Sequence, residues 1–154
     1  MNEYPQGIDE TLDNIRAAWD AGDADAYAAE FTEDASYVIF AGLISSGRGE
    51  IRADHVPVFE RWQRGSRMSM SVLDVRMLGE DVAVVVTDGG IGKARRIRHD
   101  RTVRHDRAVR HDKVQTYVLV REGDRWRCAA FQNTKRNRLF AAVNAREKAR
   151  LAAA

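Results

Sequence analysis

Features that mark several protein classes are scarce or missing in this chain. It has one cysteine, so it cannot form an internal disulfide, which fits a reducing cytoplasm. Cys128 lies inside a strand pattern with no His or Asp beside it, and we interpret it as a small buried side chain rather than a nucleophile. No apolar run approaches membrane-spanning length, and the acidic start MNEYPQGIDETLDNI does not resemble a signal peptide. We therefore expect a cytoplasmic protein with no membrane partner.

The net charge of +2 conceals regions of opposite sign. Residues 93–113 carry nine basic and three acidic side chains, and residues 135–154 carry six basic side chains and one acidic. Because these segments contribute +6 and +5, the rest of the chain has a net charge of −9. An acidic body argues against a fold built for nucleic acid, and we expect no such partner. The length of 154 residues suits one domain.

Helical patterns occupy the first part of the chain. A first apolar stripe, which ends at Gly22, consists of Ile8, Leu12, Ile15 and Trp19. A second helix is expected to begin after Asp23 and to end at residues 32–34. Its apolar face consists of Ala24, Tyr27, Ala28 and Phe31. A third helix is expected over residues 50–62, where Pro57 predicts a bend because proline removes a backbone donor. Its stripe consists of Ile51, His55, Phe59 and Trp62.

Strand patterns dominate the remainder. We expect strands at 36–40, 68–78 and 82–91, a loop at 42–49, and a late hairpin whose apolar runs 114–120 and 126–131 flank a Gly-Asp turn. This order predicts an α+β fold in which a curved antiparallel sheet wraps around a long helix. Such a cone has an open mouth, where a ligand would bind. We expect one cone domain over 1–134 with an insertion at 93–112, followed by a basic, alanine-rich helix or tail at 135–154.

The late hairpin is apolar on both faces. Pairing about the Gly-Asp turn predicts one face with Thr116 near Asn133, which we expect to face the cone interior. The opposite face is expected to carry Tyr117, Leu119, Trp126, Cys128 and Ala130. Because an apolar patch of this kind usually marks an interface, we expect a two-fold homodimer through it.

The pattern Val/Ile-Arg-His-Asp-Arg/Lys recurs with a period of six between residues 96 and 113. Three interpretations are open: a metal site of three His-Asp pairs, a nucleic-acid arm, or a tandem-duplicated surface loop. Along an extended strand His99, His105 and His111 would lie about 20 Å apart, too far for one ion. No aromatic residues are interleaved to stack on bases. We favour the loop, since long surface insertions cost little free energy, and expect no metal.

Two segments, AWDAGDADAYAAEFTEDASYVIFAGLISSGRGEI and TYVLVREGDRWRCAAFQNT, resemble the nuclear transport factor 2-like superfamily and its SnoaL-like members. The sequence is most similar to the SgcJ/EcaC family of natural-product clusters. This resemblance implies a cystatin-like cone, a homodimer through the outer sheet face and no cofactor. Superfamily members include ketosteroid isomerases, polyketide cyclases and non-catalytic binding proteins. Some members of the narrower family are labelled oxidoreductases, but GRGEIR lacks the strand–glycine arrangement of a dinucleotide site.

The chain departs from the catalytic relatives at two positions. The aspartate base of the isomerases falls at Ile39 or Phe40, and the tyrosine of their first helix falls near Ile15. None of these side chains can move a proton, so the resemblance does not imply the isomerase mechanism. His55 matches a polar pocket position on the third helix and is the candidate catalytic residue, since neutral imidazole can act as acid or base. The alternative is a hydrogen-bonded core residue, the commoner role of a histidine on an apolar helical stripe.

Other candidate ligand-binding residues accompany His55. The Asn133 amide would stabilise a ligand carbonyl or enolate, or else cap the sheet end, with Thr116 beside it. Asp88 joins the site if its strand faces inward. The aromatic wall is expected from Trp19, Tyr27, Phe31 and Phe59. We expect a largely apolar ligand, such as a polyketide or enediyne-type intermediate, that is cyclised or isomerised. The alternative is a non-catalytic module that shields an intermediate or docks on a polyketide synthase.

Overall fold

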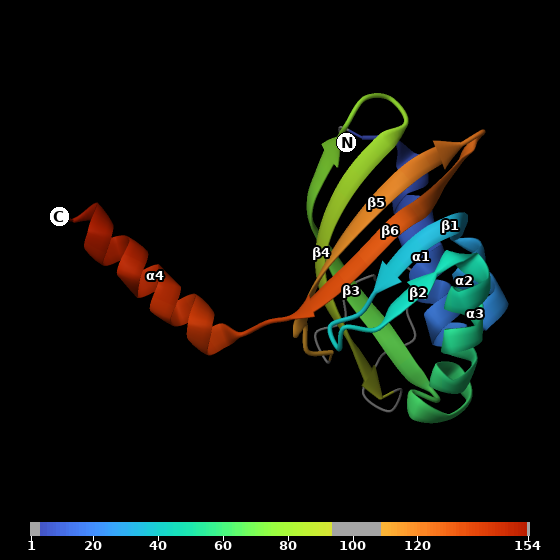
Figure 1. Ribbon diagram of the computed structural model, residues 1–154, viewed down its shortest axis with the longest axis horizontal. Coiled ribbons are helices and arrows are strands. Elements are labelled where there is room, and N and C mark those ends of the chain that lie inside the picture. The colour runs from blue at the N-terminus through green and yellow to red at the C-terminus, as the bar shows by residue number, and fades with distance from the viewer. Residues whose placement is uncertain (1–3, 94–108, 154) are drawn as a thin grey trace.

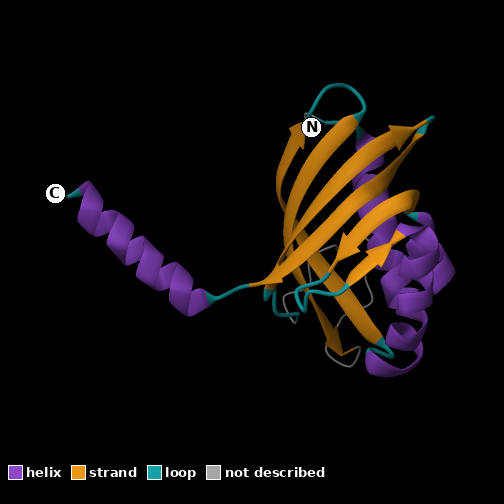
Figure 2. Ribbon diagram, in the orientation of Figure 1, coloured by secondary structure: helices purple, strands orange, loops and turns teal. Residues whose placement is uncertain are grey.

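The computed structural model describes residues 4–93 and 109–153, which form one sheet with helices packed on its concave face (Figures 1 and 2). The six strands lie in the order β2-β1-β6-β5-β4-β3. They are β1 (Phe31–Val38), β2 (Ile44–Ser46), β3 (Ser66–Met77), β4 (Val82–Lys93), β5 (Lys113–Glu122) and β6 (Arg125–Lys135). The helices are α1 (Gln6–Ala21), α2 (Ala24–Ala29), α3 (Gly47–Pro57), the π-helical turn η1 (Val58–Trp62) and α4 (Arg138–Ala152). The predicted α+β cone is confirmed.

Helix α1 supplies much of the core, as its stripe predicts. Ile8, Leu12 and Ile15 are fully buried, and each contributes roughly 1.5–3 kcal/mol by leaving water. Gly22 ends the helix with φ 65°, a left-handed conformation that glycine adopts without strain. No helix among the described residues is long and apolar enough to cross a membrane.

The region after α2 differs from the sequence prediction. Phe31 begins strand β1 instead of ending a helix, and residues 32–34 lie within that strand. The cause is tertiary: β1 pairs in parallel with β6, and the Cys128 N–H donates to the Glu30 carbonyl. Strand pairing therefore overrides a weak helical pattern, and the sheet is mixed rather than wholly antiparallel.

The three-residue strand β2 lies within residues 42–49, where the sequence predicts only a loop. Helix α3 begins directly after it. Pro57 ends α3, and the chain continues as the π-helical turn η1. His55 and Phe59 stay buried, as their stripe predicts, whereas Trp62 is 69% exposed. The wider π turn rotates the last residue off the stripe.

The β5–β6 hairpin turns the opposite face inward from the one predicted, and a β-bulge moves the end of β6 to that inner face. Near the turn Val120 lies opposite Arg127 as expected, but the register shifts between Val118 and Leu119, so Asn133 lies opposite Gln115. The inner face carries Tyr117, Leu119, Trp126 and Cys128, which are all buried. These residues form the core, so the prediction that they form a dimer interface is wrong.

The outer sheet face is rich in valine. Val84 lies opposite Val118, and Val82 lies opposite Val120, with each side chain half-buried. Thr116, on the same face, is exposed. Helix α4 extends away from the sheet (Figure 1) and has no buried residue.

Candidate functional site

The cone encloses a cavity of about 590 Å³ between the helices and the inner sheet face. Pockets of 300–1,000 Å³ typically hold drug-sized ligands. Its aromatic lining comes from five elements and includes Trp19, Tyr27, Tyr37, Tyr117 and Phe131. Neighbouring rings meet edge-on or stacked, as for Tyr37 and Phe131, whose centroids are 4.5 Å apart. The cavity therefore suits a flat, largely apolar ligand.

A chain of three hydrogen-bonding side chains crosses one wall of the cavity. The hydroxyls of Tyr27 and Tyr37 lie 2.9 Å apart, and the Tyr37 hydroxyl lies 3.2 Å from Nε2 of His55. Nδ1 of His55 lies 2.7 Å from the backbone oxygen of Ile51. All three side chains line the cavity, although each is at least 95% buried.

The direction of these hydrogen bonds follows from the Ile51 carbonyl, which can only accept. Nδ1 of His55 therefore carries the proton, and Nε2 accepts from the Tyr37 hydroxyl. Tyr27 in turn donates to Tyr37. Burial lowers the pKa of His55 despite the opposing hydrogen bond to Ile51, so its ring is neutral near pH 7. Burial also raises the pKa of Tyr37, which keeps its proton.

Two amides face the cavity from adjacent strands. Gln115 on β5 lies directly opposite Asn133 on β6. Oδ1 of Asn133 accepts from the Phe40 N–H at 2.7 Å, and Oε1 of Gln115 accepts from the Thr87 hydroxyl at 2.7 Å. Because the oxygens are used in this way, the amide N–H groups remain as donors for a ligand oxygen.

The chain matches the SnoaL-like domain model over residues 8–132, which include every residue of the cavity wall described above except Asn133. The chain belongs to the SnoaL-like family. No curated protein sequence matches it.

Solved structures under 25% identical share the fold of this SnoaL-like chain. An uncharacterized protein with a cystatin-like fold from Caulobacter vibrioides is 20% identical, with TM-score 0.72 over 93% of this chain and 96% of that one. A candidate scytalone dehydratase from Novosphingobium aromaticivorans is 14% identical, with TM-score 0.65 over 86% and 83%. A ketosteroid isomerase-like protein from Erwinia carotovora atroseptica is 17% identical, with TM-score 0.62 over 89% and 99%.

The structure brings some of the sequence-predicted site residues into this SnoaL-like cavity and excludes others. His55, Asn133, Trp19 and Tyr27 line it. Phe31 and Phe59 do not reach its surface but pack behind the Tyr27 and His55 rings. Their predicted role as cavity wall is therefore wrong.

The prediction for Thr116 is also wrong, because the face of β5 that points into the cone carries Gln115 and Tyr117, which leaves Thr116 on the outer face. Since both faces of the hairpin are apolar, the sequence carries no local signal for which one points inward. Tyr37 is a further residue of the site that the sequence analysis does not single out, since tyrosine at a strand position gives no sign of its hydroxyl partners.

Asp88 lies on the outer face of the sheet, away from the cavity. Oδ1 of Asp88 lies 2.7 Å from Nδ1 of His111, whose Nε2 lies 2.9 Å from the Ser69 hydroxyl. The Arg136 guanidinium donates to Oδ2 of Asp88 at 2.9 Å. The expectation that Asp88 joins the ligand site is therefore wrong; it fastens the last copy of the His-Asp repeat to the sheet.

The other copies of the repeat, with His99 and His105, lie outside the described residues. In the described ranges 4–93 and 109–153, no group of three His, Cys, Asp or Glu side chains is placed to hold a metal ion.

Exposed apolar side chains form the rim of the cavity. The members of this apolar rim, 52–69% exposed, are Phe40, Leu43, Ile44 and Trp62. Ile39 and Phe40 also line the cavity, and neither side chain carries a group that can transfer a proton. Asp54, which the sequence interpretation missed, is an exposed carboxylate at this edge and accepts from the Ser45 hydroxyl at 2.6 Å.

Proposed function

We propose that this chain is a cytoplasmic, cofactor-free enzyme that cyclises or isomerises a small, largely apolar ketone, such as a polyketide or enediyne-type intermediate. The hydrogen-bonded chain Tyr27–Tyr37–His55, inside an aromatic cavity, carries this proposal. Neighbours whose names refer to a dehydratase and a ketosteroid isomerase support acid–base chemistry. The narrower relationship to the SgcJ/EcaC family is part of the proposal and rests on sequence resemblance.

The reaction begins with removal of a proton from carbon next to the ligand carbonyl. Tyr37 donates its one proton to His55 and accepts one hydrogen bond from Tyr27, which leaves its second lone pair for the ligand. As the C–H bond breaks, its proton passes to the Tyr37 oxygen while the Tyr37 proton passes to Nε2 of His55. The products are an enolate and an imidazolium. The amide N–H groups of Gln115 and Asn133 stabilise the enolate oxygen, and the proton returns at another carbon.

A second function, non-catalytic binding, is favoured by the apolar residues at the isomerase base position. Ile39 and Phe40 leave that part of the cavity without a carboxylate. In this alternative the cavity shields a reactive intermediate or presents it to a polyketide synthase. His55 and Asn133 would then act only as hydrogen-bonding groups.

Deuterium exchange separates the two functions. The probe is 2-tetralone, a bicyclic ketone with exchangeable protons beside its carbonyl. In D₂O, an enzyme should accelerate loss of these proton signals in NMR spectra, and Tyr37→Phe should abolish the acceleration while saturation-transfer signals still report binding. A binding module would give saturation transfer without acceleration in the wild type. Neither signal from the wild type would contradict both functions.

We also propose a two-fold homodimer, now through the valine-rich outer sheet face. An apolar face of this kind has a lower free energy when it is buried against a partner than when it is exposed to water. Val118→Glu should therefore convert the dimer to a monomer in light scattering, while Glu10→Lys, at an exposed position on α1 on the other side of the sheet, should not. A wild-type monomer at micromolar concentration would remove this part of the proposal.

A further inference from the structure

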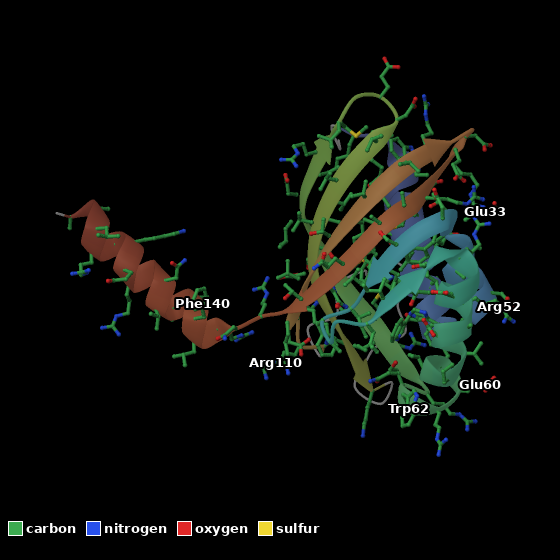
Figure 3. The ribbon with its side chains drawn as sticks, in the orientation of Figure 1. Glu33, Arg52, Glu60, Trp62, Arg110 and Phe140 are labelled. Carbon is green, nitrogen blue, oxygen red and sulfur yellow. The ribbon has the colours of Figure 1, made fainter. Side chains whose placement is uncertain are left out.

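Helix α4 carries apolar side chains that its own chain leaves uncovered. These are Leu139, Phe140, Val143 and Leu151, which are 53–78% exposed. At about 100° per residue they fall within roughly a third of the helix circumference. Figure 3 shows Phe140 on α4, well away from the body of the molecule. A helix of this kind usually needs a partner to bury its apolar side.

The junction between β6 and α4 fixes the direction of the helix. The Arg136 N–H donates to the Asp112 carbonyl at 2.8 Å, and its guanidinium pairs with Asp88. The Asn137 side chain caps the helix by accepting from the Phe140 N–H at 2.9 Å. Because these bonds direct α4 away from its own sheet, its partner surface is on another molecule.

The apolar rim defined above offers a matching surface. It is exposed, it borders the cavity, and Phe40 is tied to β6 through Asn133, three residues before Arg136. Helix α4 therefore starts beside the mouth of its own cavity. In a two-fold pair, each helix can begin at one mouth and end across the other, over a length of about 22 Å.

The charges favour a protein surface over a lipid surface. Arg146 and Arg150 fall on the same arc of α4 as its large apolar residues, whereas lipid-binding helices separate the two kinds. The rim has exposed carboxylates beside its apolar groups, from Asp54 and Glu60. Figure 3 shows Glu60 close to Trp62 at this end of the body. The net charge of −9 outside the two basic segments adds long-range attraction.

We propose that α4 of a second copy lies across the apolar rim and closes the cavity, with the exchange reciprocal in a two-fold pair. Phe140 of the second copy then becomes part of the ligand site. This arrangement does not depend on whether the cavity performs catalysis.

Photo-cross-linking of the full chain tests the proposal. Benzoylphenylalanine replaces Phe140 in one sample, and replaces Ala149 in a matched control, half a turn around the helix from Phe140. Equal amounts of ¹⁴N- and ¹⁵N-labelled protein are mixed, irradiated and digested. The expected result is cross-links from position 140 to residues 39–44 or 58–63, with both isotopes in one product, and few from position 149.

Other outcomes overturn the proposal in distinct ways. Cross-links to the rim with only one isotope would mean that α4 folds back on its own chain. Cross-links to other regions, or none, would mean that the rim is not the receptor. Flotation of the wild type with phosphatidylserine vesicles, lost in Phe140→Asp and kept in Ala149→Asp, would assign α4 to a membrane surface if no mixed-isotope product forms.

Discussion

Two histidines on opposite faces of one sheet have opposite kinds of partner. His55 faces the concave side among neutral groups, the Tyr37 hydroxyl and the Ile51 carbonyl, within aromatic rings. His111 lies on the convex side between the Ser69 hydroxyl and the Asp88 carboxylate. The contacts of His55 place Nε2 in the cavity wall as a hydrogen-bond acceptor, whereas those of His111 use both ring nitrogens to fasten residues 109–112 to the sheet. The comparison teaches that the partners of a histidine, not its burial, indicate its role.

The largest expected effect comes from replacing His55. His55→Phe keeps a ring of similar size but removes the proton acceptor, so exchange of 2-tetralone protons should fall by about 10²–10⁴-fold, the usual contribution of a general base. Binding of 2-tetralone should weaken only slightly. His111→Ala is the control and should leave the exchange rate unchanged. An equal loss of exchange rate in both variants would contradict the assignment of different roles to the two histidines.

The second effect concerns stability. His111→Ala removes hydrogen bonds to Ser69 and Asp88 in a partly buried setting, which should cost about 1–3 kcal/mol. For a chain of this size the melting temperature should fall by roughly 2–4 °C per kcal/mol. Calorimetry measures this shift, and Asp88→Asn should give part of it. A melting temperature equal to that of the wild type would show that the last repeat copy is not fastened to the sheet.

The sequence predicts the regular elements well because their periodicity reflects burial directly. The stripe of α1 is one example, and the buried pair His55 on α3 and Phe59 on η1 is another, since one face of a helix stays on one side. The β5–β6 hairpin resists prediction because one extra residue, Ala129, moves Asn133 to the other face. Phe31 resists it because a parallel strand far along the chain decides its conformation. Tyr37 is hidden because a hydroxyl network depends on three distant elements.

The third expected effect tests which face of β5 points into the cavity, at two neighbouring positions. Gln115→Leu should weaken ligand binding by about 1 kcal/mol, or roughly five-fold, because one amide donor is lost. Thr116→Val, on the outer face, should leave affinity unchanged. Titration of 2-tetralone by NMR measures both; a loss confined to Thr116→Val would mean that the opposite face of β5 lines the cavity.

The smallest expected effect is on pH dependence. Because burial lowers the pKa of His55 in the folded state, the unfolded chain binds a proton there first as the pH falls. The contribution of His55 to the free energy of unfolding is therefore fully present above about pH 6.5. It declines as the pH falls below that value, until the pH reaches the pKa of His55 in the folded state. His55→Phe should flatten this decline in melting temperature relative to the wild type. The same slope in both proteins would mean that the fold does not shift the pKa of His55.

The glycine pair in β4 has a consequence for how this chain can change during evolution. A Cβ at Gly90 would lie 2.1 Å from the Arg110 carbonyl oxygen, and one at Gly89 would lie 2.6 Å from the Ser69 carbonyl oxygen. Residues 109–112 therefore pack directly against the backbone at Gly90, and any side chain at that position would displace them. The repeat has a period of six residues. A whole copy can therefore be gained or lost while an identical Val-Arg-His-Asp segment still packs against Gly90. The number of residues between Gly90 and residue 109 can therefore change without altering this contact.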